Sequence, residues 1–230
     1  MKIYFLLILL ITSKICFSEE LIIGIGDSYS EPLIIKKGGK IKDGIIFDFV
    51  TYIGREMNWN IKFKNTPRKR VEEFLSKGEI HICPRLNRKW LKQHKRYNWS
   101  IPWMEENIII LGRHKVKTYE KLNGIIGTIR GFNYPLKLSE LFKNKTLKRQ
   151  DSLNYKTAFD MLTLNRVDYI VIPEYIANYY MKKSSKKFQN CFSIKKATLH
   201  VVVSKHANIS MPKLNKAIEK FKINQNLKKK

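Results

Sequence analysis

Apolar residues recur along the chain in a pattern that alternates between strand and helix spacing. An apolar run at 21–26 predicts a buried strand, and further strands are predicted at 60–63 and 79–83. The first helix is predicted from apolar positions at helical spacing, namely Ile46, Phe49, Val50, Ile53 and Met57. A second helix is predicted to begin at Pro67 and to end at Gly78. The resulting β-α-β-α-β order is typical of a parallel sheet covered by helices.

The same order of elements begins again at Gly124. This second block comprises predicted strands at 124–129, 146–149 and 168–172 and predicted helices at 134–142 and 155–164. Ser152 or Asn154 is expected to cap the second of these helices. The two blocks show no residue-level repeat, so their likeness lies in the order of their elements.

Two further apolar segments, at 107–111 and 197–204, lie outside the two blocks, and a last helix is predicted at 211–221. The pattern therefore predicts an α/β fold of two lobes that are joined by two extended crossings, with a separate sheet in each lobe. We place residues 19–111 and 196–230 in lobe 1 and residues 112–195 in lobe 2.

The first 18 residues have the organisation of a signal peptide. Lys2 provides a positive start, residues 4–11 are continuously apolar, and residues 16–18 form a small-x-small cleavage signal. The apolar run is well short of the roughly 20 residues that span a bilayer. We therefore expect cleavage near Ser18 and export to the periplasm; a retained anchor or a lipidated Cys16 are the alternatives.

Charge is the most unusual feature of the composition. Lys and Arg total 45 against 19 Asp and Glu, a net charge of +26, and loss of Lys2 and Lys14 with the leader leaves +24. The lysines are spread through nearly every predicted element, whereas nucleic-acid binding favours a basic face or basic residues among stacking aromatics. We therefore expect no nucleic-acid partner. The lysines either decorate solvated faces or create a field that attracts anionic ligands, lipid or cell-wall polymer.

Cysteine and histidine positions indicate neither a disulfide framework nor a metal site. Cys83 and Cys191 remain after processing, and they are either a long-range pair or two buried small residues. The five histidines are scattered without metal-ligand spacing, at positions 81, 94, 114, 200 and 206. We expect no metal and no other cofactor.

Several short strings, in the right order along nearly the whole mature chain, resemble the bacterial extracellular solute-binding proteins of family 3, the polar-amino-acid-binding type. They are LIIG at 21–24, GIIFD at 44–48, LSKGEI at 75–80, WSIP at 99–102, LNGIIG at 122–127 and NRVD at 165–168. The resemblance implies a periplasmic binding protein-like fold with a ligand cleft between the lobes, and delivery of a small polar ligand to an ABC importer. We expect a monomer.

Candidate binding residues follow from the position of ligands in open α/β sheets, beyond the carboxyl ends of the strands. The loops there contain Asp27, Tyr29, Arg85, Asn87, Arg88, Arg130, Gly131, Phe132, Asn133 and Glu174. Arg85 and Arg88 suit planar, two-donor contacts with a carboxylate or phosphate, and Tyr29 suits an apolar part of the ligand. The apolar walls are expected from Tyr29, Trp90, Trp103, Phe132 and Tyr134.

The anchors that amino-acid binders of this family use are displaced here. Gln93 stands at the position of the carboxylate-binding arginine, Phe132 and Asn133 replace the small hydroxyl residue, and Pro173 stands where an acid would take the ammonium group, with Glu174 one step on. The resemblance therefore implies the fold without implying a free α-amino acid as ligand.

The sequence thus predicts a non-catalytic clamp for a small, polar, carboxylate-bearing ligand. One alternative is a stand-alone ligand sensor or partner-binding module. The other is a dehydratase-like enzyme on the same scaffold, for which Glu174, Asp27 or His81 would have to act as acid or base.

Overall fold

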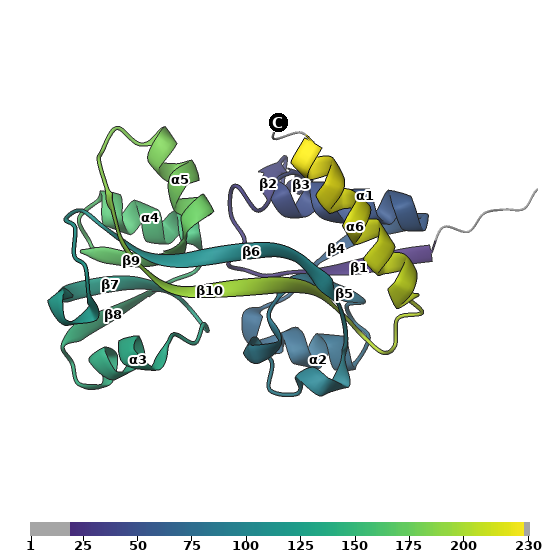
Figure 1. The fold of residues 1–230 in the computed structure, drawn as a ribbon, viewed down its shortest axis with the longest axis horizontal. Coiled ribbons are helices and arrows are strands. Elements are labelled where there is room, and N and C mark those ends of the chain that lie inside the picture. Colours follow the sequence, from purple (N-terminus) through teal and green to yellow (C-terminus); the bar gives the residue numbers. More distant parts are fainter. Residues whose placement is uncertain (1–18, 228–230) are drawn as a thin grey trace, which may run out of the picture.

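The computed structural model describes residues 19–227, so the predicted leader at residues 1–18 lies outside the described residues. Two lobes lie side by side, and two long strands run from one to the other (Figure 1). Helices cover both faces of the strands in each lobe. This is the α/β architecture that the repeated pattern predicts.

Lobe 1 is built around the strands nearest the N-terminus. Its elements are β1 (Glu19–Ile25), β2 (Ile35–Lys37), β3 (Lys40–Asp43), α1 (Ile45–Met57), β4 (Trp59–Asn65), α2 (Val71–Ser76), β5 (Ile82–Leu86) and the C-terminal α6 (Met211–Leu227). Three single-turn helices complete it: η1 (Arg68–Arg70), η2 (Arg88–Trp90) and η3 (His94–Arg96). β1 pairs in parallel with β4 and β5, which is the outcome of βαβ connections.

Lobe 2 repeats this organisation. Its elements are η4 (Tyr119–Lys121), β7 (Gly124–Ile129), α3 (Leu136–Lys143), β8 (Leu147–Ser152), α4 (Tyr155–Thr163), β9 (Tyr169–Pro173) and α5 (Glu174–Lys183). β7 pairs in parallel with β8 and β9. Asn154 caps α4, because its side-chain oxygen accepts a hydrogen bond from the Thr157 N–H at 2.9 Å.

The crossings are β6 (Asn98–Gly112) and β10 (Gln189–Val203), which are 15 residues each and antiparallel to one another. They are longer than the predicted segments and serve both lobes, because the C-terminal end of β10 pairs with β5 of lobe 1 and the C-terminal end of β6 pairs with β9 of lobe 2. The hydrogen-bonded order is therefore β4-β1-β5-β10-β6-β9-β7-β8, one continuous ladder. The expectation of a separate sheet in each lobe is wrong for this reason.

We expect the middle of the crossings to act as a hinge. β10 pairs with β5 from residue 200 onwards, and β6 pairs with β9 from Ile108 onwards. Between these points, residues 104–107 of β6 pair with residues 196–199 of β10, and the described part of the chain provides no third strand there. A two-stranded ribbon bends more easily than a packed sheet, so relative motion of the lobes is expected at this segment.

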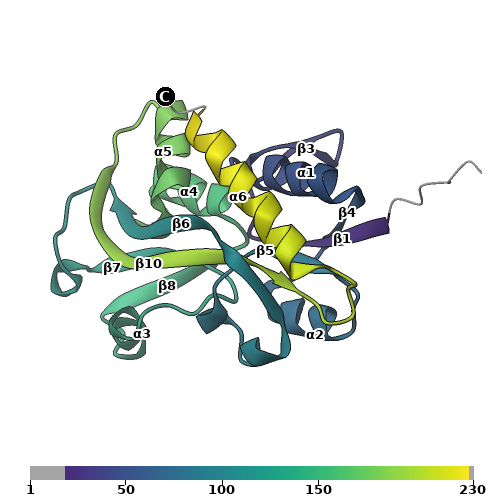
Figure 2. The ribbon, with the colours of Figure 1, turned by 45° about the vertical axis from the view of Figure 1, so that its right-hand side comes forward.

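Aromatic packing joins the N-terminal and C-terminal parts of lobe 1. Phe49 of α1 stacks on Trp103 of β6 with ring centroids 3.8 Å apart, and Phe221 of α6 meets Phe49 edge-on at 5.1 Å. α6 packs against α1, which it crosses at an angle in Figure 1 and beside which it lies in Figure 2. Gly44 permits this placement of α1, because its φ is 111° and a Cβ there would lie 2.7 Å from the Leu33 carbonyl oxygen.

The third strand begins later than its sequence predicts. The 79–83 segment was expected to be strand, but Glu79 and Ile80 turn back to donate to the Phe74 carbonyl, and β5 covers Ile82–Leu86. Arg85 therefore lies within a fully buried strand and not in a loop. Glu174 likewise is not in a loop, because α5 begins at that residue directly after β9; this helix and the β2–β3 hairpin were not predicted.

Cys83 and Cys191 are both buried and free, so the long-range pair is absent and each behaves as a small apolar residue. Burial raises the pKa of the Cys83 thiol to about 11. Among the helices of residues 19–227, none is long and apolar enough to cross a membrane.

Candidate functional site

A cavity of about 410 Å³ lies between the two lobes. Lobe 1 contributes residues of η1 and η2, the crossings contribute their central residues, and lobe 2 contributes the ends of its strands and helices. The lining comprises Arg68, Lys89, Trp90, Glu106, Ile108, Phe132, Asn133, Tyr134, Pro135, Tyr155, Val171, Pro173, Ile194 and Lys195. A ligand here would touch both lobes, which is the arrangement required for closure to depend on binding.

The loop after β7 forms one wall. Gly131 has a φ of +78°, and this left-handed turn lets the Phe132 N–H donate to the Ile129 carbonyl at 3.2 Å. Tyr134 is held in place by a hydrogen bond, because its hydroxyl oxygen accepts the Ile129 N–H at 2.8 Å. Phe132 packs edge-on against Tyr155, the first residue of α4, with centroids 6.4 Å apart. Hydrogen bonds and ring packing therefore position the aromatic side chains of the lobe 2 wall.

Three cations occupy the cavity lining. Arg68 is held in place by a hydrogen bond from its Nη2 to the Trp90 carbonyl at 3.0 Å, and Lys89 and Lys195 lie on η2 and β10. Within residues 19–227, none of these three side chains forms an ion pair with a carboxylate. The cavity is therefore electropositive and has side-chain donors available for an anion.

A buried ion pair lies at the hinge beside the cavity. Arg85 Nη2 of β5 donates to Glu106 Oε2 of β6 at 2.5 Å, and the two side chains are only 2% and 1% exposed. Burial disfavours the charge of Arg85, but the adjacent Glu106 carboxylate raises the pKa of the guanidinium well above its ordinary value. Arg85 therefore keeps its positive charge, and this charge is directed at Glu106 and not at the cavity.

Tyrosines from both lobes surround this pair. Tyr175 of α5 lies 3.4 Å from Glu106 through its hydroxyl, and the Arg85 guanidinium lies 5.7 Å from the centre of the Tyr29 ring. Burial raises the pKa of Tyr155 to about 12, in spite of the nearby positive charge of Arg85. Burial also raises the pKa of Tyr29 and of Tyr175 well above the ordinary value. All three are neutral hydrogen-bonding groups at physiological pH.

Contacts between the loop after β1 and α5 hold the lobes together. Glu31 accepts hydrogen bonds from the Tyr179 hydroxyl at 2.7 Å and from Lys183 Nζ at 3.3 Å, and the Tyr180 hydroxyl lies 3.2 Å from Ser30 Oγ. The hydrogen bond from Tyr179, followed by the contribution of Lys183, lowers the pKa of the Glu31 carboxyl below its ordinary value. We call Ser30, Glu31, Tyr179, Tyr180 and Lys183 the interlobe latch.

Replacement of Glu31 by Gln is expected to loosen this latch. Because Glu31 is partly exposed and its pKa is lowered, its contribution is present above the ordinary carboxyl pKa of 4.5 and is lost as the pH falls through the lowered value. We expect ligand release from the Gln variant to be about two- to fivefold faster at pH 7, as for a surface ion pair worth up to 1 kcal/mol. Stopped-flow dissociation measures it.

Glu73→Gln is the matched control, since Glu73 pairs with Arg70 and Lys77 of its own lobe. Equal release rates for the Glu31 variant and the native protein would show that the latch does not hold the lobes closed.

The structure brings some of the predicted binding residues to the cavity. Phe132 and Asn133 line it, and Gly131 shapes the turn that presents them, a Cβ at this position lying 3.7 Å from Lys69 of lobe 1. Of the expected aromatic walls, Trp90 and Tyr134 line the cavity as well. Trp103 does not, because it stacks on Phe49 in the lobe 1 core.

The other predicted residues have different surroundings. Asn87 caps η2 and donates to the Thr198 carbonyl at 2.8 Å, and exposed Arg88 lies over the Trp99 ring. Arg130 is exposed beyond β7, and Asp27 is in the turn after β1, outside the cavity lining. Glu174 accepts hydrogen bonds from Asn107 at 3.0 Å and Asn190 at 2.9 Å.

Sequence reasoning missed Arg68, Lys89, Glu106, Tyr155 and Lys195 as cavity residues. Arg68 follows Pro67, where a helix was predicted to begin after the strand at 60–63. Its position beyond the end of a strand could therefore have identified it as a candidate binding residue. Lys195 and Glu106 lie within the crossings, where a periodic pattern does not reveal which side chains face the cavity.

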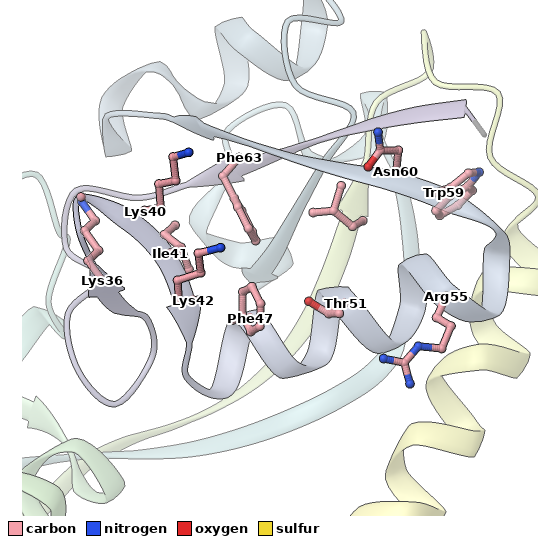
Figure 3. A pocket seen from close by; sticks show the side chains of 12 residues that line it. Lys36, Lys40, Ile41, Lys42, Phe47, Thr51, Arg55, Trp59, Asn60 and Phe63 are labelled. Atoms are coloured by element: carbon pink, nitrogen blue, oxygen red, sulfur yellow. The ribbon is translucent and has the colours of Figure 1, made fainter. Parts of the chain in front are cut away.

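A larger hollow of about 670 Å³ lies on the outside of lobe 1, between the β2–β3 hairpin, α1 and β4 (Figure 3). Phe47 and Phe63 face each other at its centre, and Lys36, Lys40 and Lys42 project from the hairpin side. All of its lining residues belong to lobe 1. Closure of the lobes therefore cannot enclose a ligand there, and the interlobe cavity is the candidate functional site.

Comparison with known proteins identifies the fold. No protein-family model and no curated protein sequence matches the chain. An ancestral arginine-binding protein bound to arginine has a TM-score of 0.75 at 21% identity, covering 91% of this chain and 95% of that chain. A point mutant of the arginine-bound arginine-binding protein from T. maritima has a TM-score of 0.71 at 17% identity, covering 88% and 95%.

The GluR0 ligand-binding core from Nostoc punctiforme, in complex with L-glutamate, has a TM-score of 0.71 at 12% identity, covering 89% and 94%. The chain therefore has the periplasmic binding protein-like fold, two α/β lobes with a cleft between them. At these identities the likeness concerns the fold and not the ligand.

Proposed function

We propose that this protein is an exported, non-catalytic solute-binding protein whose lobes close on a small, carboxylate-bearing molecule for ABC-type import. The observation that carries the proposal is the interlobe cavity, whose lining comes from both lobes and contains three cations that have no carboxylate partner among the described residues. The two-stranded hinge and the interlobe latch support it, since they are the parts that a binding-driven closure needs. The amino-acid-binding structural neighbours support the small polar ligand.

The residues nominated for acid–base chemistry are dispersed, which favours binding over catalysis. Glu174 is hydrogen-bonded to Asn107 and Asn190, and Asp27 lies outside the cavity lining. His81 accepts a hydrogen bond from the Ile22 N–H at 3.3 Å on the outer part of lobe 1. A general acid or base has to reach the reacting atoms, and these three do not converge.

Trp90 provides a direct test, because it lines the cavity whereas Trp59 lines the outer hollow. Small molecules released by denaturing the purified protein are identified by mass spectrometry and titrated back onto the emptied protein. We expect a saturable change in tryptophan fluorescence that Trp90→Phe largely removes and Trp59→Phe retains. A protein that carries no small molecule and responds to no carboxylate, amino acids included, would contradict the proposed function.

A further inference from the structure

The cavity contains an excess of positive charge that the chain itself does not neutralise. Arg68, Lys89 and Lys195 lie around it without ion-pair partners among residues 19–227. Of the lining residues, Glu106 is the one carboxylate, and it is committed to Arg85 in a fully buried pair. The cavity thus offers several groups for an anion and no free carboxylate for a cation.

The remaining lining is apolar and largely aromatic. Trp90 comes from lobe 1, and Phe132, Tyr134 and Tyr155 come from lobe 2. Ile108, Val171 and Ile194 complete the wall. Flat aromatic side chains that both lobes contribute to a cavity of about 410 Å³ suit a planar ring, and this volume is at the small end of the range of about 300–1,000 Å³ for small-molecule sites.

Two other acidic residues lie near the cavity, but neither is part of its lining. Glu105 and Glu174 line a neighbouring hollow along the crossings that shares Glu106 with the cavity. Glu174 accepts hydrogen bonds from two asparagine side chains, and Glu105 is exposed to solvent. An ammonium group bound between Trp90 and Phe132 would therefore be desolvated near three cations without a counter-charge, which is unfavourable.

We propose, on the basis of the function proposed above, that the ligand is an aromatic carboxylic acid without an ammonium group, such as an aryl-propionate or aryl-2-oxo acid. Its ring lies between Trp90 and the Phe132–Tyr155 pair, and Arg68 with Lys89 and Lys195 binds its carboxylate. The absence of an acid at Pro173, where one would bind an ammonium group, is then a consequence of the ligand's chemistry.

Three matched pairs of probes test the proposal by isothermal titration calorimetry on the ligand-free protein. They are 3-phenylpropionate with L-phenylalanine, 3-(4-hydroxyphenyl)propionate with L-tyrosine, and indole-3-propionate with L-tryptophan. In each pair the two molecules differ by one ammonium group. We expect at least one acid to bind, and to bind at least about tenfold more tightly than its amino-acid partner, because the unpaired ammonium group is not compensated.

Two variants, each with a matched control, test how the charge of the cavity lining affects binding. Arg68→Gln is expected to weaken the acid about tenfold to a hundredfold, as for loss of a hydrogen bond to a charged group, whereas Arg96→Gln, an exposed change on η3, leaves affinity within about twofold. Asn133→Asp places a carboxylate in the cavity wall and is expected to shift the preference toward the amino acid. Asn178→Asp, exposed on α5, is its matched control.

Equal or tighter binding of the amino acids would overturn the proposal while leaving the solute-binding function in place, and loss of that binding in Glu174→Gln would identify the acid responsible. Failure of all six probes would also overturn it. In that case the mass spectrometry of released molecules decides separately whether the protein binds a solute at all.

Discussion

Replacement of Arg85 by Met is expected to destabilise the protein by about 3–5 kcal/mol, because it leaves the Glu106 carboxylate buried without a counter-charge. The two side chains are only 2% and 1% exposed, so solvent compensates poorly for the lost counter-charge. The free energy of unfolding is measured by urea denaturation with both tryptophan fluorescence and circular dichroism as probes.

The matched control is Arg113→Met. Arg113 and Asp168 form an ion pair of similar length, 2.7 Å, but their side chains are 30% and 39% exposed. We expect this change to cost less than about 1 kcal/mol, as is usual for solvent-accessible pairs. The double replacement Arg85→Met with Glu106→Leu is expected to recover most of the stability, since apolar pairs often replace buried ion pairs without loss. A cost below 1 kcal/mol for Arg85→Met alone would contradict the buried pair.

The two-lobe architecture was predictable from sequence because its signals are local. The helical spacing of Ile46, Phe49, Val50 and Ile53 specifies α1 without reference to the rest of the chain, and Asn154 is itself the cap of α4. The order of strands and helices then restricts the fold to a parallel α/β arrangement. The structure confirms this fold class and most of the predicted elements.

The environment of Arg85 was not predictable because it depends on strand register. An alternating apolar run identifies a strand, but its ends are set by the partner strand, and β5 is aligned by its pairing with β10, more than 100 residues away. The partner of Arg85, Glu106, lies 21 positions along the chain in a crossing that gave no sign of a buried acid. The sequence therefore did not reveal that Arg85 already forms an ion pair with Glu106 and is not free to bind a ligand.

The candidate site was predictable where it lies on loops and not where it lies on the crossings. Phe132 and Asn133 follow a strand, and ligands in α/β folds lie beyond strand ends. Lys195 and Glu106 reach the cavity because the lobes approach one another around the hinge, which is a property of the assembled fold.

Replacement of Phe49 by Ala is expected to cost about 3–5 kcal/mol, the range for removing a buried aromatic side chain. Phe49 is fully buried, stacks on Trp103 at 3.8 Å and meets Phe221 at 5.1 Å, so its loss leaves a cavity between α1, β6 and α6. Trp103 in turn donates a hydrogen bond from Nε1 to the carbonyl of Pro84, which precedes Arg85 in β5. We therefore expect the loss of Phe49 to disturb the packing of β5 as well. Urea denaturation measures the loss, and near-ultraviolet circular dichroism reports on Trp103.

Phe47→Ala is the matched control on the same helix, two positions away. Phe47 faces the outer hollow, is only partly buried, and contacts Phe63 at a centroid distance of 6.2 Å (Figure 3). Its neighbours can relax into open space, so we expect a cost of about 1 kcal/mol or less. Similar costs for the two variants would contradict the assignment of Phe49 to the core, whereas a large difference would establish that α1 is held by its Trp103 face and leaves the Phe47 face open.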